Sequence, residues 1–278
     1  MGMLRRDLIM DVGMHDGTDT AYYLAKGFNV VAVEANPALV TAARRRFASE
    51  IEQGRLTIVD AAIAEEKGLV RLAVCDGQTI WSTLDPDYVK RNSRKFRYRY
   101  LEVPALSFEE LLLEHGVPYY LKVDIEGMDM LPVRALRTVR ERPQYLSIES
   151  EVSSSHATRD RVDAEFAELW SLGYRRFQFV NQRKLSRAVE PKPPLEGNYV
   201  GGRFSAESSG PFGRELGGRW LTIRQARAQA VLLRFKHNIG GYGGRWRGTP
   251  VGFAYAVTRR LVLRRAPSWY DLHARLGN

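Results

Sequence analysis

The chain of 278 residues has very little cysteine and no long hydrophobic run. Its single cysteine, Cys75, has no partner for a disulfide within the chain, so a disulfide scaffold is excluded and a reducing, cytoplasmic compartment is expected. No stretch approaches the ~18 uncharged apolar residues of a membrane-spanning helix. The first ten residues contain only a short apolar run behind several charges, which lacks the apolar core of a signal peptide.

The composition is otherwise that of a globular protein, with a basic excess at one end. Hydrophobic residues make up 44% and charged residues 27%, which excludes global disorder and collagen. The net charge is +10, yet residues 1–200 carry 28 basic and 29 acidic side chains, whereas residues 201–278 carry 14 and 3. This shift predicts one domain over residues 1–200 and a basic C-terminal extension over 201–278. Such an extension favours an anionic partner.

Strand-like and helix-like segments alternate over about the first 180 residues. The predicted strands are 8–10, 29–34, 56–59, 119–125, 145–149 and 176–180. The predicted helices are 18–26, 37–47, 108–115, 129–140 and 159–172. Alternation with short connections predicts parallel β–α–β units with helices on both faces of the sheet. Ligands of such sheets bind at the carboxyl ends of the strands.

The turn after the first strand is glycine-bracketed and acidic. Gly13 and Gly17 enclose it, and Asp11 stands at the strand end. It lacks both G-x-G-x-x-G and a lysine followed by Ser or Thr, and an acid there would repel a pyrophosphate. A cationic or hydroxyl-rich ligand fits better, and His15 would face it.

An acidic residue also ends the second strand. Glu34 lies 23 residues after Asp11, close to the offset of ~20 at which a carboxylate reaches a bound ribose. A carboxylate can accept two hydrogen bonds from a vicinal diol. Together the two strand ends predict a nucleoside without a phosphate at the first turn, and S-adenosyl-L-methionine meets that description.

Two further strand ends carry charged side chains. Lys122, Asp124 and Glu126 alternate onto one face if the strand stays extended, and such groups are costly to bury without a role. Glu149 ends the next strand. Residues 78–100 interrupt the alternation with a basic and aromatic segment, which is interpreted as a lid, a substrate contact or a solvated excursion.

These residues resemble the FkbM family of S-adenosylmethionine-dependent methyltransferases. The matching segments, in order over about residues 8–180, are Asp11-Val12-Gly13 with Gly17, Val33-Glu34-Ala35-Asn36-Pro37, Trp81-Ser82-Thr83 and Leu121-Lys122-Val123-Asp124-Ile125-Glu126-Gly127. The resemblance implies an α/β, Rossmann-like class I methyltransferase fold with a mostly parallel seven-stranded sheet and helices on both faces. It also implies O-methylation of a hydroxyl on a sugar, a glycan or glycolipid, or another secondary metabolite.

The resemblance also implies residue roles. Asp11 and Gly13 would line the methionine part of the cofactor, Glu34 the ribose, and Asp60, Ala61 and Ala62 the adenine. Asp124 and Glu126 would lie beside the methyl group or the substrate. The expected cofactor set is completed by His15, Asp16, Gly17, Ala35, Asn36 and Asp124. The expected substrate contacts are Trp81, Ser82, Lys122 and Glu149.

The chemistry expected at this site is proton removal from an acceptor hydroxyl. Asp124 or Glu126 is the favoured base, with His15 as the alternative. A divalent metal such as Mg²⁺, held by Asp124, Glu126 and Glu149, is an open alternative because hard oxygen ligands suit that ion.

Two other functions are compatible with the charge distribution. The basic tail would suit an RNA-directed methyltransferase, but the chain lacks an Asn/Asp-Pro-Pro-Tyr motif, so nucleic acid is the less favoured partner. The second of these functions is that of a non-catalytic protein with a vestigial nucleotide fold, which binds anionic lipid or glycan. Residues 220–237 predict a basic helix that either packs on the core or lies peripherally on an anionic membrane.

Overall fold

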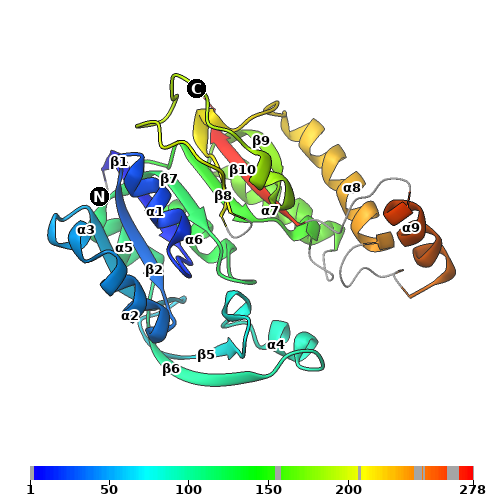
Figure 1. The fold of residues 1–278 in the computed structure, drawn as a ribbon, viewed down its shortest axis with the longest axis horizontal. Coiled ribbons are helices and arrows are strands. Elements are labelled where there is room, and N and C mark those ends of the chain that lie inside the picture. Colours follow the sequence, from blue (N-terminus) through cyan, green and yellow to red (C-terminus); the bar gives the residue numbers. More distant parts are fainter. Residues whose placement is uncertain are drawn as a thin grey trace.

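The predicted fold class is confirmed by a computed structural model, which describes residues 3–153, 158–205, 208–240, 246, 248–261 and 269–277. A seven-stranded sheet has the order β3-β2-β1-β7-β8-β10-β9 (Figure 1). All its strands are parallel except β10, which runs antiparallel to both neighbours. The strands are β1 (Leu4–Val12), β2 (Asn29–Glu34), β3 (Leu56–Asp60), β7 (Val117–Val123), β8 (Tyr145–Glu149), β9 (Tyr174–Asn181) and β10 (Tyr270–Leu276).

Helices cover both faces of this sheet because its strands are apolar on both sides. In β1, Leu8 and Met10 pack into one hydrophobic cluster and Ile9 packs into another on the opposite face. The first cluster is covered by α5 (Phe108–His115), α6 (Met130–Ala135), α7 (Arg159–Ser171) and α8 (Ile223–Gly240). The second is covered by α1 (Thr18–Ala25), α2 (Pro37–Arg46) and α3 (Ala48–Glu52).

The helix starts follow the capping signals in the sequence. The Asn36 side chain accepts a hydrogen bond from the Ala38 N–H at the start of α2. Ser107 and Glu110 form the predicted capping box at the start of α5. Each cap satisfies backbone N–H groups that the helix cannot pair internally, which fixes where the helix begins.

The segment that interrupts the alternation belongs to a second, three-stranded sheet. This sheet has the order β4 (Ala62–Ile63), β6 (Tyr98–Leu106), β5 (Gly68–Cys75), and its own buried apolar cluster. It lies below the main sheet in Figure 1, with helix α4 (Pro86–Asn92) beside it. Of residues 78–100, residues 98–100 lie in β6 and Thr83 pairs with Ala73 of β5, while only Thr83 and Val89 of the described side chains are buried.

The boundary expected at residue 200 differs from the structure. Residues 270–276 form β10, which lies between β8 and β9 in the main sheet. Phe212 is fully buried among aromatic rings of the second cluster, stacked on Tyr120 at a centroid distance of 4.6 Å. The charge shift at residue 200 misplaced the boundary because β10 carries charged and polar side chains at Asp271, His273 and Arg275, so its sequence gives a weak strand signal.

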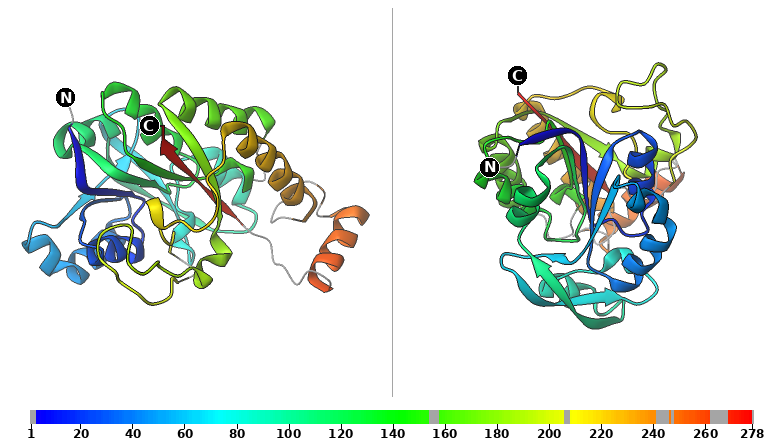
Figure 2. Two further views of the ribbon diagram at one scale, coloured as in Figure 1. Left: turned by 90° about the horizontal axis from the view of Figure 1, so that it is seen from above. Right: turned by 90° about the vertical axis from the view of Figure 1, so that its left-hand side faces the viewer.

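The remainder of the C-terminal segment forms a projection. Helix α8 packs on the first cluster through Ala226, Ala230 and Leu233, and α9 (Pro250–Leu261) extends beyond it, away from the sheet (Figure 2). No helix among the described residues is long and apolar enough to cross a membrane.

A buried ion cluster attaches the segment after β9 to helix α1. The Lys26 ammonium lies 2.7 Å from a Glu215 oxygen and 3.1 Å from a Glu190 oxygen, with Lys26 and Glu215 fully buried. The Tyr22 hydroxyl donates to Glu190 over 2.6 Å. Because these charges have almost no contact with water, each depends on its partners for compensation.

We predict that Lys26→Met lowers the free energy of unfolding by about 3–5 kcal/mol, because it leaves two buried carboxylates without their cation. Urea denaturation measures this change. Arg5→Met is the matched control, since the Arg5–Asp7 pair is exposed and such pairs contribute about 0–1 kcal/mol. If both variants lose the same free energy of unfolding, the Lys26 cluster does not stabilise the attachment of this segment.

Candidate active site

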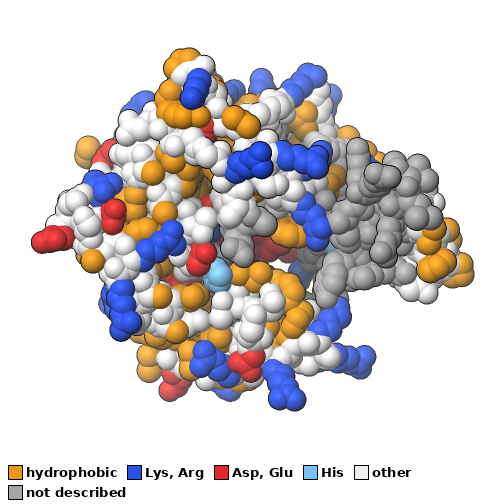
Figure 3. All heavy atoms as spheres, viewed as in Figure 1, with side chains coloured by type: hydrophobic (Ala, Val, Ile, Leu, Met, Phe, Trp, Pro, Cys, Tyr) orange, Lys and Arg blue, Asp and Glu red, His pale blue; other side chains and the backbone are white. Residues whose placement is uncertain are grey.

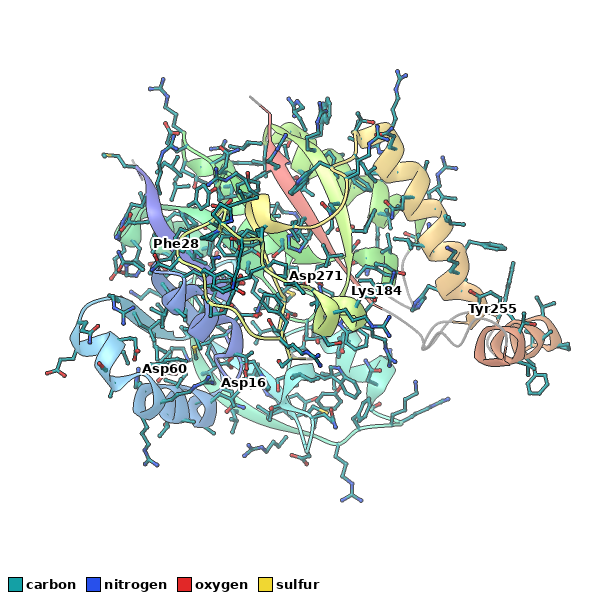
Figure 4. All side chains as sticks on the ribbon, turned by 45° about the horizontal axis from the view of Figure 1, so that its top comes forward. Asp16, Phe28, Asp60, Lys184, Tyr255 and Asp271 are labelled. Atoms are coloured by element: carbon teal, nitrogen blue, oxygen red, sulfur yellow. The ribbon has the colours of Figure 1, made fainter. Side chains whose placement is uncertain are left out.

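Acidic side chains gather at one edge of the main sheet. The parallel strands β1, β2, β3, β7 and β8 all end there, and β10 begins there because it runs the opposite way. Glu34 stands opposite Asp60 across β2 and β3, and Asp271 stands opposite Glu149 across β10 and β8. Figure 4 labels Asp60 and Asp271, which lie apart from each other in the molecule. Tyr255 marks helix α9, which lies at the end of the molecule far from Asp60.

A buried lysine joins three elements behind this edge. The Lys122 ammonium lies 3.1 Å from an Asp11 oxygen and 4.0 Å from an Asp19 oxygen, and it donates to the Gly13 carbonyl over 2.9 Å. Lys122 thus ties β7 to the end of β1, to the following turn and to helix α1. It also lies 3.8 Å from Asp124 at the front of the site.

The charges in this network compensate one another. Burial alone would lower the pKa of Lys122, but Asp11, Asp124 and Asp19 outweigh it and raise that pKa above the usual value. Burial raises the pKa of Asp19. Asp19 also accepts hydrogen bonds from the Ser208 hydroxyl and the Ser209 N–H, so the C-terminal segment contributes to the same network.

Several residues expected to touch ligands have buried side chains. Asp11 is completely buried, and its second oxygen accepts from the Thr20 hydroxyl over 2.6 Å. Lys122 is 4% exposed, so it positions the turn rather than contacting substrate. Ala61 and Ala62 are also buried. The residue types in the sequence correctly indicated which edge of the sheet carries these groups. They did not indicate the direction in which each side chain points.

The glycine turn is shaped by a close approach to β7. Gly13 has φ of 86°, and a Cβ at this position would lie 1.9 Å from the Asp124 carbonyl oxygen. The N–H groups of Gly13 and Met14 both donate to the Val33 carbonyl of β2. Glycine at position 13 is therefore required by contact with the protein's own backbone.

Glu34 is held by two backbone N–H groups. One of its oxygens accepts from the His15 N–H and the other from the Asn36 N–H, both over 2.8 Å. Burial raises the pKa of Glu34 to about 7, although these two hydrogen bonds oppose the change. The carboxylate keeps further lone pairs for a ligand, because an ionised carboxylate accepts about four hydrogen bonds.

The other predicted cofactor residues shape the turns around Glu34. Asp16 is exposed and accepts from the Thr18 N–H and hydroxyl at the start of α1. Gly17 has φ of 77° and packs against Phe47, while Asn36 caps α2. Ala35 is half-buried between Glu34 and that cap. Asp60 lies 3.4 Å from Arg44, whose charge it faces.

Three carboxylates converge at the ends of β7 and β8. Asp124, Glu126 and Glu149 each offer an oxygen that lies within 4.8 Å of the others. Burial and the charges of Glu149 and Asp124 raise the pKa of Glu126 well above its usual range. Burial and Asp124 raise that of Glu149 in the same way. Asp124 is the accessible member, with 48% of its side chain exposed.

The structure adds acidic and aromatic residues that the sequence analysis missed. Burial and the charges of Asp124 and Glu149 raise the pKa of Asp271 well above its usual range. Asp129 accepts from the Ile125 and Gly127 N–H groups and so fixes the loop that carries Glu126. The Tyr88 hydroxyl donates to Glu126. An acid at the start of β10 could have been found only by recognising that strand.

The second sheet is attached to the site through the Trp81-Ser82-Thr83 segment. The Thr83 hydroxyl donates to the Glu126 carbonyl over 2.6 Å, and His15 Nε2 lies 2.9 Å from the Thr79 hydroxyl oxygen. The Trp81 and Phe96 rings pack at a centroid distance of 4.3 Å with a tilt of 57°, and the Ser82 hydroxyl donates to the Thr79 carbonyl. Trp81 and Ser82 therefore line the neighbourhood of His15 and Glu126 as parts of one packed unit.

Fold and site together define a Rossmann-like α/β protein with an acidic ligand edge. The family described as the methyltransferase FkbM domain matches residues 11–177, which is well over half of the chain. The chain belongs to this methyltransferase family. No curated protein matches the chain.

Three solved structures are similar to the chain. The methyltransferase FkbM from Methylobacillus flagellatus is 17% identical, with a TM-score of 0.40, and the match covers 65% of this chain and 41% of that one. The precorrin-6y C5,15-methyltransferase from Geobacter metallireducens is 14% identical, with a TM-score of 0.35 and coverage of 72% and 76%. The cyclase SpnF is 8% identical, with a TM-score of 0.34 and coverage of 97% and 75%. The chain thus spans less than half of the Methylobacillus protein.

We predict that Gly13→Ala destabilises the fold by about 1–3 kcal/mol more than Gly54→Ala, as measured by urea denaturation. Both glycines have positive φ, so both variants incur the left-handed backbone cost of about 1–2 kcal/mol. Only Gly13 has an atom in the path of the added Cβ, whereas nothing lies within 4 Å at Gly54. A Gly13 variant as stable as the Gly54 variant would mean that the turn can move away from β7.

Proposed function

We propose that the chain transfers a methyl group from S-adenosyl-L-methionine to a hydroxyl of a sugar, a glycan or glycolipid, or another secondary metabolite. Membership of the methyltransferase family supports the reaction type. The observation that carries the choice of oxygen chemistry is the accessible Asp124 carboxylate beside Glu126 and Glu149 at the ends of β7 and β8. An alcohol becomes a competent nucleophile as its proton leaves, and a carboxylate here can receive that proton.

The residues around Glu34 fit a nucleoside with a free diol. Glu34 is oriented by two backbone N–H groups and retains lone pairs toward the ligand edge. The edge is acidic, which favours the sulfonium and ammonium charges of S-adenosylmethionine over a pyrophosphate. We assign Glu34 to the ribose, with Asp60 opposite it on the neighbouring strand.

S-adenosylmethionine, when bound, supplies an electrophilic methyl group. Asp124 orients the acceptor hydroxyl and takes its proton, and it lies 3.8 Å from the Lys122 ammonium. Glu126, hydrogen-bonded to Tyr88, and Glu149 lie at the same point, and burial and mutual charge raise the pKa of each. His15 is the alternative base, although its ring already meets the Thr79 hydroxyl.

A divalent cation is the second chemistry that the three carboxylates could support. Their oxygens lie within 4.8 Å of one another, a spacing that permits a shared hard cation such as Mg²⁺. Such an ion would polarise the acceptor hydroxyl and reduce the repulsion among the carboxylates. Turnover assayed with EDTA and with added Mg²⁺ separates the two chemistries, since a carboxylate base needs no ion.

We predict that S-adenosylhomocysteine binds the wild-type chain about tenfold more tightly at pH 8 than at pH 6, as measured by isothermal titration calorimetry. The pKa of Glu34 is raised to about 7, and the ionised form accepts hydrogen bonds from the diol, so affinity rises as pH rises through that value. Glu34→Gln should remove this pH dependence and weaken binding about 10- to 100-fold at pH 8. Glu114→Gln, at an exposed carboxylate, is the control. A Glu34→Gln variant that keeps the wild-type pH profile would refute the ribose assignment.

We predict that Asp124→Asn abolishes methyl transfer while S-adenosylhomocysteine binding stays within about threefold of wild type, because the amide cannot take a proton. Methylation is followed with radiolabelled S-adenosylmethionine against a panel of sugars, glycans and hydroxylated metabolites. Turnover near the wild-type level would exclude Asp124 as the base. If turnover by the wild-type chain depends on added Mg²⁺ and is lost with EDTA, the three carboxylates act by holding a metal ion instead.

A further inference from the structure

Helix α8 has two apolar faces, and among the described residues only one of them packs on the core. Ala226, Ala230 and Leu233 are buried against the core. At 100° per residue, Val231, Leu232 and Phe235 lie on the opposite side of the helix. Their exposed fractions are 60%, 50% and 53%. A helix that only packed on the core with a solvated face would carry polar side chains there.

The neighbouring helix extends this apolar surface. In α9, Val251, Phe253 and Val257 are exposed, and Phe253 is 70% exposed. Trp246 bridges the two helices, with its ring 6.4 Å from that of Phe235. Figure 3 shows hydrophobic side chains at the tip of this projecting lobe. In α9, Phe253 and Val257 share one face of the helix at 100° per residue. We call Val231, Leu232, Phe235, Trp246, Phe253 and Val257 the apolar ridge.

Basic side chains flank the apolar ridge. Arg224 and Lys236 are exposed on α8, before and after Phe235 and its neighbours. A groove of about 530 Å³ opens between α7 and α8, and its charged lining residues are Arg159, Arg227, Arg234 and Asp163. Asp163 lies 3.6 Å from both Arg159 and Arg227, so the three arginines leave a net positive charge in the groove. The sequences of α8 and α9 contain six Lys and Arg residues and no Asp or Glu, so the field around the ridge is positive.

We propose that the apolar ridge docks on the surface of an anionic phospholipid bilayer. Exposed Phe, Trp and Val side chains between cations are the pattern of helices that lie in a membrane interface, with apolar groups in the acyl boundary and cations at the headgroups. The basic groove beside the ridge offers a place for anionic headgroups. A second copy of the chain fits this surface less well, because it would bring two strongly basic segments together.

Vesicle sedimentation tests this proposal, using phosphatidylglycerol–phosphatidylcholine vesicles and pure phosphatidylcholine vesicles. The wild-type chain should sediment with the anionic vesicles, fail to sediment with the neutral ones, and be released at about 1 M NaCl. The double variant Phe235→Ser with Phe253→Ser should lower partitioning about tenfold or more. The double variant Arg224→Gln with Lys236→Gln should also lower it about tenfold.

Leu113→Ser is the matched control, since Leu113 is 64% exposed on α5, away from the ridge. It should sediment like the wild type, and every variant should keep its thermal midpoint, which separates lost docking from lost folding. The proposal is overturned if the wild-type chain does not sediment with anionic vesicles. It is also overturned if the Phe235 and Phe253 double variant sediments as strongly as the wild type. A concentration-dependent dimer that this variant disperses, without vesicle binding, would assign the ridge to a second copy instead.

Discussion

The site depends on one buried cation. Lys122 reaches from β7 to Asp11 at the end of β1, to the Gly13 carbonyl of the turn, and toward Asp19 in α1. Without that charge, two buried carboxylates would face each other behind the turn, a situation that costs several kcal/mol. Lys122 thereby fixes the spacing of the strands whose ends carry the acids that we propose to face the ligand. The contact of Asp19 with Ser208 and Ser209 extends the same network to the C-terminal segment.

Near Lys122, the structure contains residues with strained backbone conformations and carboxyl groups with raised pKa values. His15 and Glu126 are the non-glycine residues with positive φ among those described, and both lie at the ligand edge. Such backbone conformations persist where the surroundings impose them, often at functional sites. Glu126, Glu149 and Asp271 are carboxyl groups whose pKa values are all raised by burial and mutual charge. A cationic or hydrogen-donating ligand would relieve part of that repulsion, which fits the proposed methyl transfer.

The acidic and the basic side chains of the molecule lie in different places, at the proposed active-site edge of the sheet and in the projecting lobe. The acids lie at the carboxyl ends of the strands, whereas the basic excess lies in the segment that contains α8 and α9. The chemistry of methyl transfer and the proposed attachment to a surface therefore involve different residues. This division explains how a chain with a net charge of +10 can present an acidic ligand edge.

The sequence by itself determined the alternation of strands and helices, the caps at Asn36 and Ser107, and the acids at the strand ends, because each is encoded by local periodicity or spacing. It did not reveal β10, the second sheet or Asp271, since these depend on pairing between segments far apart in the chain. It also could not separate Asp11 and Lys122, which turn inward to neutralise each other, from Glu34 and Asp124, which face the ligand edge. That choice is decided by burial, which is a property of the tertiary structure: a charged side chain is stable inside only where a partner from another strand compensates it.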